Sequence, residues 1–279
     1  MPTQLIPVRN CFRALFRALL GASFVVVLAS LSLALGTSPA YAAAATDPLP
    51  ATVARVKPSV VGVGTLLKTR QPATVFVGTG FVVGDGLSVI TNAHVIPERL
   101  DVAGMEELGI VVGSGPETVG FRPARLVGLD REHDLAHLRL SGAPLPALAL
   151  GENDAVAEGQ LLAFTGYPLG MRLGLHAATH RATLAAIAPA VRPSLNSRQL
   201  DARAIAQLQR SAFGIFQLDG TAYPGNSGSP LYEPDSGAVV GVINMVYLKG
   251  LKESAVSDPS GITYAIPVRY VRELLQRSP

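Results

Sequence analysis

Three short motifs carry residues that together could activate a serine. Ser227 lies between Gly225 and Gly228 in the sequence YPGNSGSP, where glycine lets the backbone bend sharply. A tight bend of this kind can expose a hydroxyl group and direct neighbouring N–H groups at one point, which is the geometry that nucleophilic catalysis requires. Taken alone, the motif is equally typical of a surface turn.

Two motifs upstream supply the partners that a serine nucleophile needs. His94 stands in the motif TNAHV, directly after an apolar run. The imidazole of histidine ordinarily titrates near neutrality, which suits a general base. Asp134 heads the apolar strand-like run DLAHLRL, where its carboxylate could orient that base. Asp130 and Glu132 are nearby rivals for this role, but they belong to the polar turn before the strand.

In this order the motifs resemble those of the trypsin-like serine proteases with the two-barrel chymotrypsin fold, and within them the HtrA/Deg branch. The matching segments are TNAHV, DLA, GNSG and GITYAIP, which together run through nearly all of the chain after residue 42. The resemblance implies that His94 is the general base and Asp134 its orienting carboxylate. It also implies that Ser227 is the nucleophile and that the backbone N–H groups of Gly225 and Ser227 form the oxyanion hole.

The same resemblance implies the fold and the reaction. The fold would be all-β, with two antiparallel six-stranded β-barrels and a C-terminal helix. The reaction would be hydrolysis of protein or peptide substrates through an acyl-enzyme intermediate, without a cofactor.

The resemblance further indicates which residues surround the substrate side chain before the scissile bond. None of them is acidic, so a preference for Lys or Arg is not expected, and small to medium apolar side chains are favoured. The pocket residues are Thr221, Ala222, Asn244, Met245 and Val246.

Two alternative functions remain open. An esterase with the α/β-hydrolase fold requires Gly-x-Ser-x-Gly and the chain order Ser, Asp, His. Here Ser229 replaces the second glycine, and the order is His94, Asp134, Ser227. The other alternative is a two-barrel binding or scaffold protein without turnover, because a sequence does not reveal whether an oxyanion turn is competent.

The first 42 residues have the pattern of a secretory signal peptide. Three arginines precede an apolar run over residues 19–35, and the tripeptide AYA ending at Ala42 resembles a cleavage site. A retained membrane anchor is the alternative, because the apolar run is near the length that spans a bilayer. We therefore expect a bacterial protein that is exported to the periplasm or secreted, with no membrane contact once the leader is removed.

Composition excludes several classes of function. The chain has 23 Lys and Arg against 20 Asp and Glu, and three of those arginines lie in the leader, so the remainder balances at 20 against 20. A neutral balance gives no electrostatic case for nucleic-acid binding. Cys11, also in the leader, is the only cysteine, so the mature chain has no disulfide and no thiolate ligand. No metal site is expected, because His176 and His180 have neither an acidic partner nor a third ligand nearby.

Short strand-like runs separated by Gly/Pro turns divide the mature chain into two halves. We expect an N-terminal arm at residues 43–58, a first barrel at residues 59–145, and a second barrel with a closing helix at residues 146–279. Residues 173–187 are expected to hold two strands, although their alanines blur the alternation. Larger members of the family continue into a PDZ domain. Few residues follow the GITYAIP motif here, so no PDZ domain is expected.

The segment at residues 189–211 is long for a connection inside a compact domain, and such segments are often functional. Leu200, Ala204 and Leu208 have helical spacing within it. The resembling family uses a loop in this region to sense activating signals, so we expect the segment to control the competence of the site. A static surface elaboration is the alternative, and the oligomeric state is not predicted.

Overall fold

The computed structural model describes residues 47–113, 119–152, 156–170, 174–190, 213–244 and 261–278. The chain divides into two compact units, Met1–Asp47 and Pro48–Pro279, and every helix and strand below belongs to the second. The expected signal peptide and most of the segment 189–211 lie outside the described residues. Within the described residues, no helix is long and apolar enough to span a membrane.

Six antiparallel strands of the described chain close the first barrel, in the order β1-β2-β3-β6-β5-β4. Each strand is hydrogen-bonded to its neighbours in this order, including β1 to β4. The strands are β1 Val60–Leu66, β2 Thr74–Val83, β3 Ser88–Asn92, β4 Glu107–Gly113, β5 Val119–Asp130 and β6 Leu135–Leu140.

The second barrel is closed in the same way, in the order β10-β11-β12-β9-β8-β7. Its strands are β7 Leu161–Gly166, β8 Ala178–Pro189, β9 Gly214–Asp219, β10 Pro230–Tyr232, β11 Val239–Asn244 and β12 Ile262–Pro267. The fold predicted from the sequence, two six-stranded antiparallel barrels with a C-terminal helix, is therefore confirmed.

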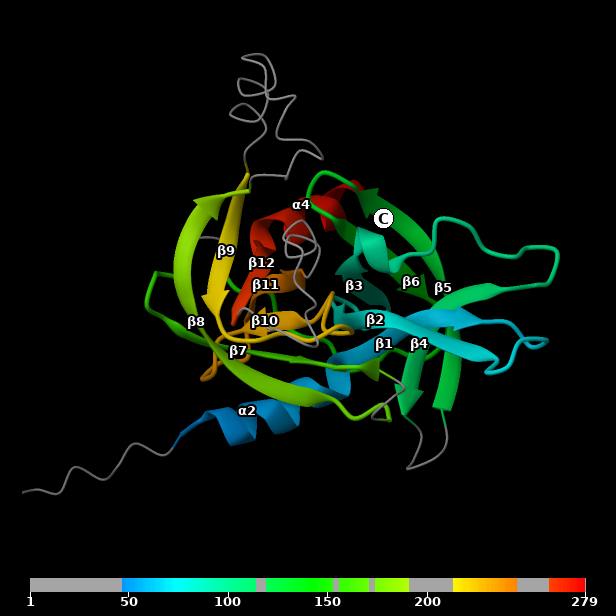
Figure 1. The fold of residues 1–279 in the computed structure, drawn as a ribbon, viewed down its shortest axis with the longest axis horizontal. Coiled ribbons are helices and arrows are strands. Elements are labelled where there is room, and N and C mark those ends of the chain that lie inside the picture. Colours follow the sequence, from blue (N-terminus) through cyan, green and yellow to red (C-terminus); the bar gives the residue numbers. More distant parts are fainter. Residues whose placement is uncertain are drawn as a thin grey trace, which may run out of the picture. The chain divides into compact units, whose positions relative to one another are not determined.

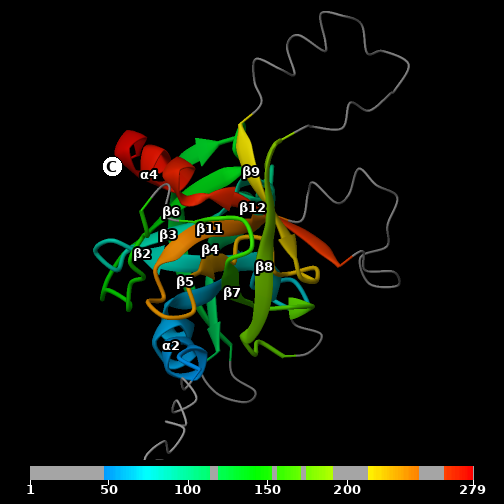
Figure 2. The ribbon, with the colours of Figure 1, turned by 90° about the vertical axis from the view of Figure 1, so that its left-hand side faces the viewer.

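Two helices accompany the barrels. Figure 1 shows β1–β6 on the right and β7–β12 on the left, with α4 (Val268–Arg277) at the top and α2 (Leu49–Val56) at the bottom. Figure 2 again places the two helices at opposite ends of this unit. Pro267 directly precedes the first turn of α4, whose side chains Val268, Val271 and Leu274 are buried. These three residues recur at helical spacing and form one apolar face.

The strands that face the other barrel are buried on both sides. On β2, Val82 belongs to the core inside the first barrel, whereas Phe81 and Val83 pack into a second cluster. That second cluster also contains Tyr232 and Val242 from the other barrel. Because alternate side chains on a strand point to opposite faces, these strands have an unbroken apolar sequence instead of an alternating one. Each fully buried Val, Ile or Phe contributes about 1.5–3 kcal/mol to the packing.

The connection between the barrels contacts both of them. Leu148 forms a bridge with Val83 of the first barrel, and Leu150 forms one with Val239 of the second. The domain boundary expected near residue 145 stays a prediction, since this segment is bonded to both sides.

One expectation about the strands is wrong. In place of two strands in residues 173–187, the structure has the single strand β8. Its first part pairs with β7 and its second part with β9, with an irregularity between Leu184 and Ala186. The alanines gave no contrast between the two faces, so the sequence pattern did not reveal that one continuous strand serves both neighbours.

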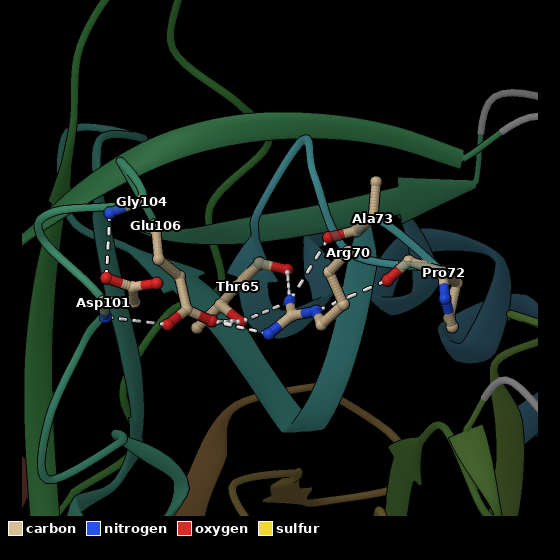
Figure 3. Close-up of polar contacts among 7 residues, drawn as sticks. All are labelled: Thr65, Arg70, Pro72, Ala73, Asp101, Gly104 and Glu106. Atoms are coloured by element: carbon tan, nitrogen blue, oxygen red, sulfur yellow. Dashed lines mark hydrogen bonds and ion pairs between the residues drawn. The ribbon is translucent and has the colours of Figure 1, made fainter.

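A polar cluster joins the turn after β1 to the loop before β4 (Figure 3). Glu106 accepts hydrogen bonds from the Thr65 hydroxyl at 2.6 Å and from Arg70 Nη1 at 2.7 Å. Its second carboxylate oxygen accepts from the backbone N–H of Asp101 at 3.0 Å. The hydrogen bond from Thr65, with those from Asp101 and Arg70, lowers the pKa of Glu106 from 4.5 to about 2. The cluster therefore stabilises the charged carboxylate.

The Glu106→Gln variant should be less stable than the wild type at pH 7. Folding lowers the pKa of Glu106, so its contribution is complete above the ordinary pKa of 4.5 and is lost as the pH falls towards about 2. The difference in melting temperature between the two proteins should therefore narrow over that range. Glu107→Gln, which changes the exposed neighbouring carboxylate, is the matched control. An equal loss at pH 7 in both variants would contradict this account.

Candidate active site

The end of β3 and the start of β6 bring two of the predicted site residues together. Asn92 pairs with Leu135 in the sheet, so the residues that follow one and precede the other lie at the same edge. His94 lies in a short 3-10 turn, η2 (Ala93–Val95), just beyond β3. Asp134 directly precedes β6, and its carbonyl accepts hydrogen bonds from Ala93 N–H and from the Asn92 amide, both at 3.0 Å.

The Asp134 carboxylate fixes the orientation of the His94 ring. Its Oδ1 accepts the backbone N–H of His94 at 2.9 Å, and its Oδ2 lies 2.6 Å from His94 Nδ1. Because Nδ1 faces a carboxylate, the proton of a neutral imidazole belongs on Nδ1, and Nε2 becomes the acceptor. A histidine held in this tautomer can take a proton from a hydroxyl group.

A third bond to the same carboxylate comes from the other barrel. Asn244, at the end of β11, donates its amide N–H to Asp134 Oδ2 at 2.7 Å. Asn244 is fully buried. The sequence predicted Asn244 for the substrate pocket and gave no sign of this contact, because no local pattern connects residues 110 positions apart.

The turn that carries Ser227 has the geometry expected for its glycines. Gly225 and Gly228 have φ angles of +101° and +87°, values that side chains other than glycine rarely adopt. A Cβ at Gly228 would also lie 2.0 Å from the carbonyl oxygen of Thr79. The turn is closed by hydrogen bonds from Asn226 N–H to the carbonyl of Tyr223 and from Ser229 N–H to that of Asn226.

Thr79 of β2 holds this turn from the first barrel. Its N–H donates to the carbonyl of Ser227 at 2.9 Å, and its hydroxyl donates to the carbonyl of Gly225 at 2.6 Å. The Thr79 hydroxyl in turn accepts the N–H of Tyr167 at 3.1 Å, and the Thr79 carbonyl accepts the hydroxyl of Thr91 at 2.6 Å. The serine turn thus belongs to one barrel by sequence and is held by the other.

Gly78 shows how closely Ser227 approaches the histidine turn. A Cβ at Gly78 would lie 2.7 Å from Cγ2 of Val95, the neighbour of His94, and 3.1 Å from the carbonyl oxygen of Ser227. The described residues include no hydrogen bond between the His94 and Ser227 side chains. In structures without substrate, catalytic hydrogen bonds are often long or poorly aligned.

Alternate N–H groups of the serine turn differ in their bonding. Those of Asn226 and Gly228 donate to the carbonyls of Tyr223 and Ile243. Those of Gly225 and Ser227, the two expected in the oxyanion hole, donate to no residue in the described part of the chain. Gly225 and Ser227 are separated by one residue, Asn226, and two N–H groups this close in the chain can donate to the same oxygen atom.

The predicted substrate pocket is only partly described. Ala222 is buried, and its N–H donates to the hydroxyl of Thr263 at 2.9 Å. Thr221 is half-buried beside it. Met245 and Val246 lie outside the described residues.

The other histidines are placed away from metal-like arrangements. His180 lies on β8, stacked on Phe164 with the ring centroids 4.8 Å apart, and burial lowers the pKa of His180. His176 lies in the loop before this strand. Among the described residues, no group of three or more His, Cys, Asp or Glu side chains could hold a metal ion.

Comparison with known proteins gives the family. The family model described as "Trypsin-like peptidase domain" matches residues 78–242, more than half of the chain. The chain therefore belongs to the trypsin-like peptidases, as the motifs predicted.

The relatives that the chain resembles include HtrA-like serine proteases. The chain is 29% identical over 192 residues to a "Probable periplasmic serine endoprotease DegP-like" of Halomonas elongata, covering 68% of this chain and 32% of that one. It is 31% identical over 208 residues to "Serine protease HTRA2, mitochondrial" of Drosophila willistoni, covering 75% of this chain and 40% of that one. The chain thus spans about a third to two fifths of the length of these relatives.

Solved structures agree on the fold. The "HtrA-type protease AlgW with tripeptide" matches with a TM-score of 0.56 and 25% identity, covering 82% of this chain and 62% of that one. The active form of the Rv3671c protease from M. tuberculosis matches with a TM-score of 0.59 and 22% identity, covering 84% and 86% of the two chains.

The Gly78→Ala variant should lose peptidase activity because the added methyl group enters the space between Val95 and the Ser227 carbonyl. Small displacements of a catalytic group have large kinetic effects, so we expect turnover of a denatured protein substrate to fall about tenfold or more.

Gly80→Ala is the matched control on the same strand. Its Cβ would be similarly crowded, 2.9 Å from Val63 Cγ2 and 3.0 Å from the carbonyl of Ile90, but within the first barrel. It should lower the melting temperature and leave turnover by the folded protein near the wild-type rate. Equal kinetic losses in Gly78→Ala and Gly80→Ala would contradict a specific role for the space at Gly78.

Proposed function

We propose that this chain is an exported serine endopeptidase that cleaves peptide bonds with Ser227, His94 and Asp134. The observation that supports this proposal most strongly is the bonding of the Asp134 carboxylate. It holds both the ring and the backbone N–H of His94, and it receives the Asn244 amide from the other barrel. That arrangement leaves His94 Nε2 as a proton acceptor beside the turn that carries Ser227.

Acylation would begin when a peptide carbonyl lies against Ser227. Its Oγ attacks the carbonyl carbon while His94 Nε2 takes the hydroxyl proton, and Asp134 stabilises the imidazolium ion. The carbonyl oxygen becomes an oxyanion that the N–H groups of Gly225 and Ser227 bind; one such donor contributes roughly 3–4 kcal/mol in other enzymes. Collapse of this intermediate breaks the C–N bond. The leaving amine takes the proton from Nε2, and the acyl group stays on Ser227 as an ester.

Deacylation would repeat these steps with water as the nucleophile. His94 Nε2 takes a proton from the water as its oxygen attacks the ester carbon, and the same two N–H groups bind the second oxyanion. Collapse breaks the ester bond and returns the proton to Ser227 Oγ. The products are a carboxylic acid and the regenerated hydroxyl group, and no cofactor takes part in either half-reaction.

The proposed substrates are proteins or peptides with a small to medium apolar residue before the scissile bond. Thr221, Ala222, Asn244, Met245 and Val246 would surround that side chain, and none of them carries an acid that could pair with Lys or Arg. Asn244 is uncharged when it donates to Asp134, so its hydrogen bond adds no charged group to these five pocket residues.

An exported location completes the proposal. Its support is the sequence pattern of the first 42 residues, in which a basic region, an apolar run and the AYA tripeptide follow one another. The Halomonas elongata relative described above, whose name calls it periplasmic, is consistent with this location. The balanced charge beyond the leader gives no reason to expect nucleic-acid binding.

Ser227→Ala should abolish hydrolysis of a peptide library while the melting temperature stays near that of the wild type. Loss of a triad member lowers turnover by roughly 10⁴ to 10⁶ in related chemistry. The assay should use an ester substrate in parallel, because an esterase would hydrolyse the ester and leave the peptides intact.

Ser229→Ala is the control for the neighbouring hydroxyl. The Ser229 side chain is fully buried, and its Oγ has no hydrogen-bond partner among the described residues, so its loss should leave both the fold and turnover intact. If Ser227→Ala kept more than about a tenth of the wild-type rate, the assignment of the nucleophile would fail. A wild-type protein that hydrolyses neither substrate would support the scaffold alternative.

A further inference from the structure

The residue before Asp134 is enclosed by aromatic rings from the second half of the chain. The His133 ring stacks on Tyr270 of α4, with the centroids 3.9 Å apart and the planes at 16°. It also makes an edge contact with Phe213, at the entrance to β9, with the centroids 4.7 Å apart. Phe213 and Tyr270 contact each other as well, at 5.4 Å. The three rings form a closed set, which we call the aromatic clamp.

Asp130 anchors the other side of His133. Its carboxylate accepts the backbone N–H of His133 at 3.0 Å and lies 2.8 Å from His133 Nδ1. Arg277 of α4 donates to the same carboxylate at 2.9 Å. Burial alone would raise the pKa of Asp130, but the hydrogen bonds from the side chain and backbone of His133 hold it below its usual value. His133 is therefore held at one face of its ring by Tyr270, by the edge contact with Phe213, and at Nδ1 by Asp130.

The backbone conformation of Asp134 depends on the turn that the aromatic clamp holds. Its backbone has a φ of +54°, in the left-handed region that residues other than glycine rarely occupy. Such a conformation is strained and persists only where surrounding contacts determine it. In it, Asp134 presents one carboxylate oxygen to the backbone and the other to the ring of His94. The backbone conformation at Asp134 sets the direction of its Cα–Cβ bond and so contributes to where the carboxylate lies.

We propose that His133 is a positioning residue, whose packing against Tyr270 and Phe213 holds the turn that aims Asp134 at His94. This proposal deepens the proposed function and rests on it, because it assigns to α4 and β9 a part in orienting the general base. Neither Tyr270 nor Phe213 contacts the reacting atoms in this account. Their effect is transmitted through one peptide bond, and it is local because the stacked residue and the carboxylate are adjacent in the chain.

The test measures kinetics and the His94–Asp134 hydrogen bond in the same variants. His133→Ala removes the ring, and His133→Phe keeps the ring without its bond to Asp130. Tyr270→Leu removes the ring that stacks on His133. In each protein, kcat and KM are measured on one peptide, and the proton on His94 Nδ1 is observed by NMR. A proton in a hydrogen bond to a carboxylate as short as 2.6 Å resonates far downfield, and its loss in His94→Ala identifies it.

Ser278→Ala is the matched control at the same helix. The Ser278 hydroxyl contacts His137 at 2.9 Å, so this change loosens the contact of α4 with β6 without touching His133. It should lower the melting temperature and leave kcat and the His94 resonance unchanged.

The proposal predicts that His133→Ala lowers kcat by about tenfold to a hundredfold with KM within about twofold, and shifts or broadens the His94 resonance. Tyr270→Leu should act in the same direction, and His133→Phe should restore most of the rate. Wild-type kcat and an unmoved resonance in His133→Ala would overturn it. If His133→Ala does not fold, wild-type kcat and an unmoved His94 resonance in Tyr270→Leu would overturn the proposal. Failure of the proposed function is separate: the wild type would then be inactive, and the resonance would still report whether the clamp positions Asp134.

Discussion

The Asp134 carboxylate is the point on which the geometry of this site depends. Its two oxygens accept three hydrogen bonds: two from His94 and one from Asn244 in the other barrel. A carboxylate that accepts this many hydrogen bonds holds each donor in a fixed direction. The orientation of the imidazole is therefore determined by the fold and needs no substrate to establish it.

This arrangement makes the site a property of both barrels together. Asn244 reaches from the second barrel to Asp134 in the first, and Thr79 reaches from the first barrel to the Ser227 turn in the second. The apolar cluster between the barrels, with Phe81 from one side and Tyr232 from the other, supplies the packing that keeps these polar bonds in register. The bond from Asn244 is to a charged group and contributes about 1.5–3 kcal/mol, and each neutral bond from Thr79 contributes about 0.5–1.5 kcal/mol. Together these bonds fix the relative position of the barrels as well as the site.

The sequence predicted the fold and the motifs but not the contacts that join them. His94, Asp134 and Ser227 stood out because glycine, histidine and acid occurred in local patterns with a chemical meaning. Thr79 and the amide of Asn244 carry no such pattern, since their importance arises from partners more than a hundred residues away. Strand β8 was divided wrongly for a related reason: its alanines do not distinguish a buried from an exposed face. Local chemistry can be read from the sequence, whereas bonding between barrels requires the fold.

The central claim is that Ser227 becomes nucleophilic through the base that Asp134 orients. The most direct measurement combines intact-protein mass spectrometry with peptide mapping after reaction with a fluorophosphonate, for the wild type and for Asp134→Asn. The account predicts one adduct per chain, on Ser227, and a reaction at least about a hundredfold slower in Asp134→Asn, since the corresponding change in a related enzyme lowers kcat by roughly 10⁴. An adduct on another residue, no adduct in the wild type, or equal rates in the two proteins would contradict it.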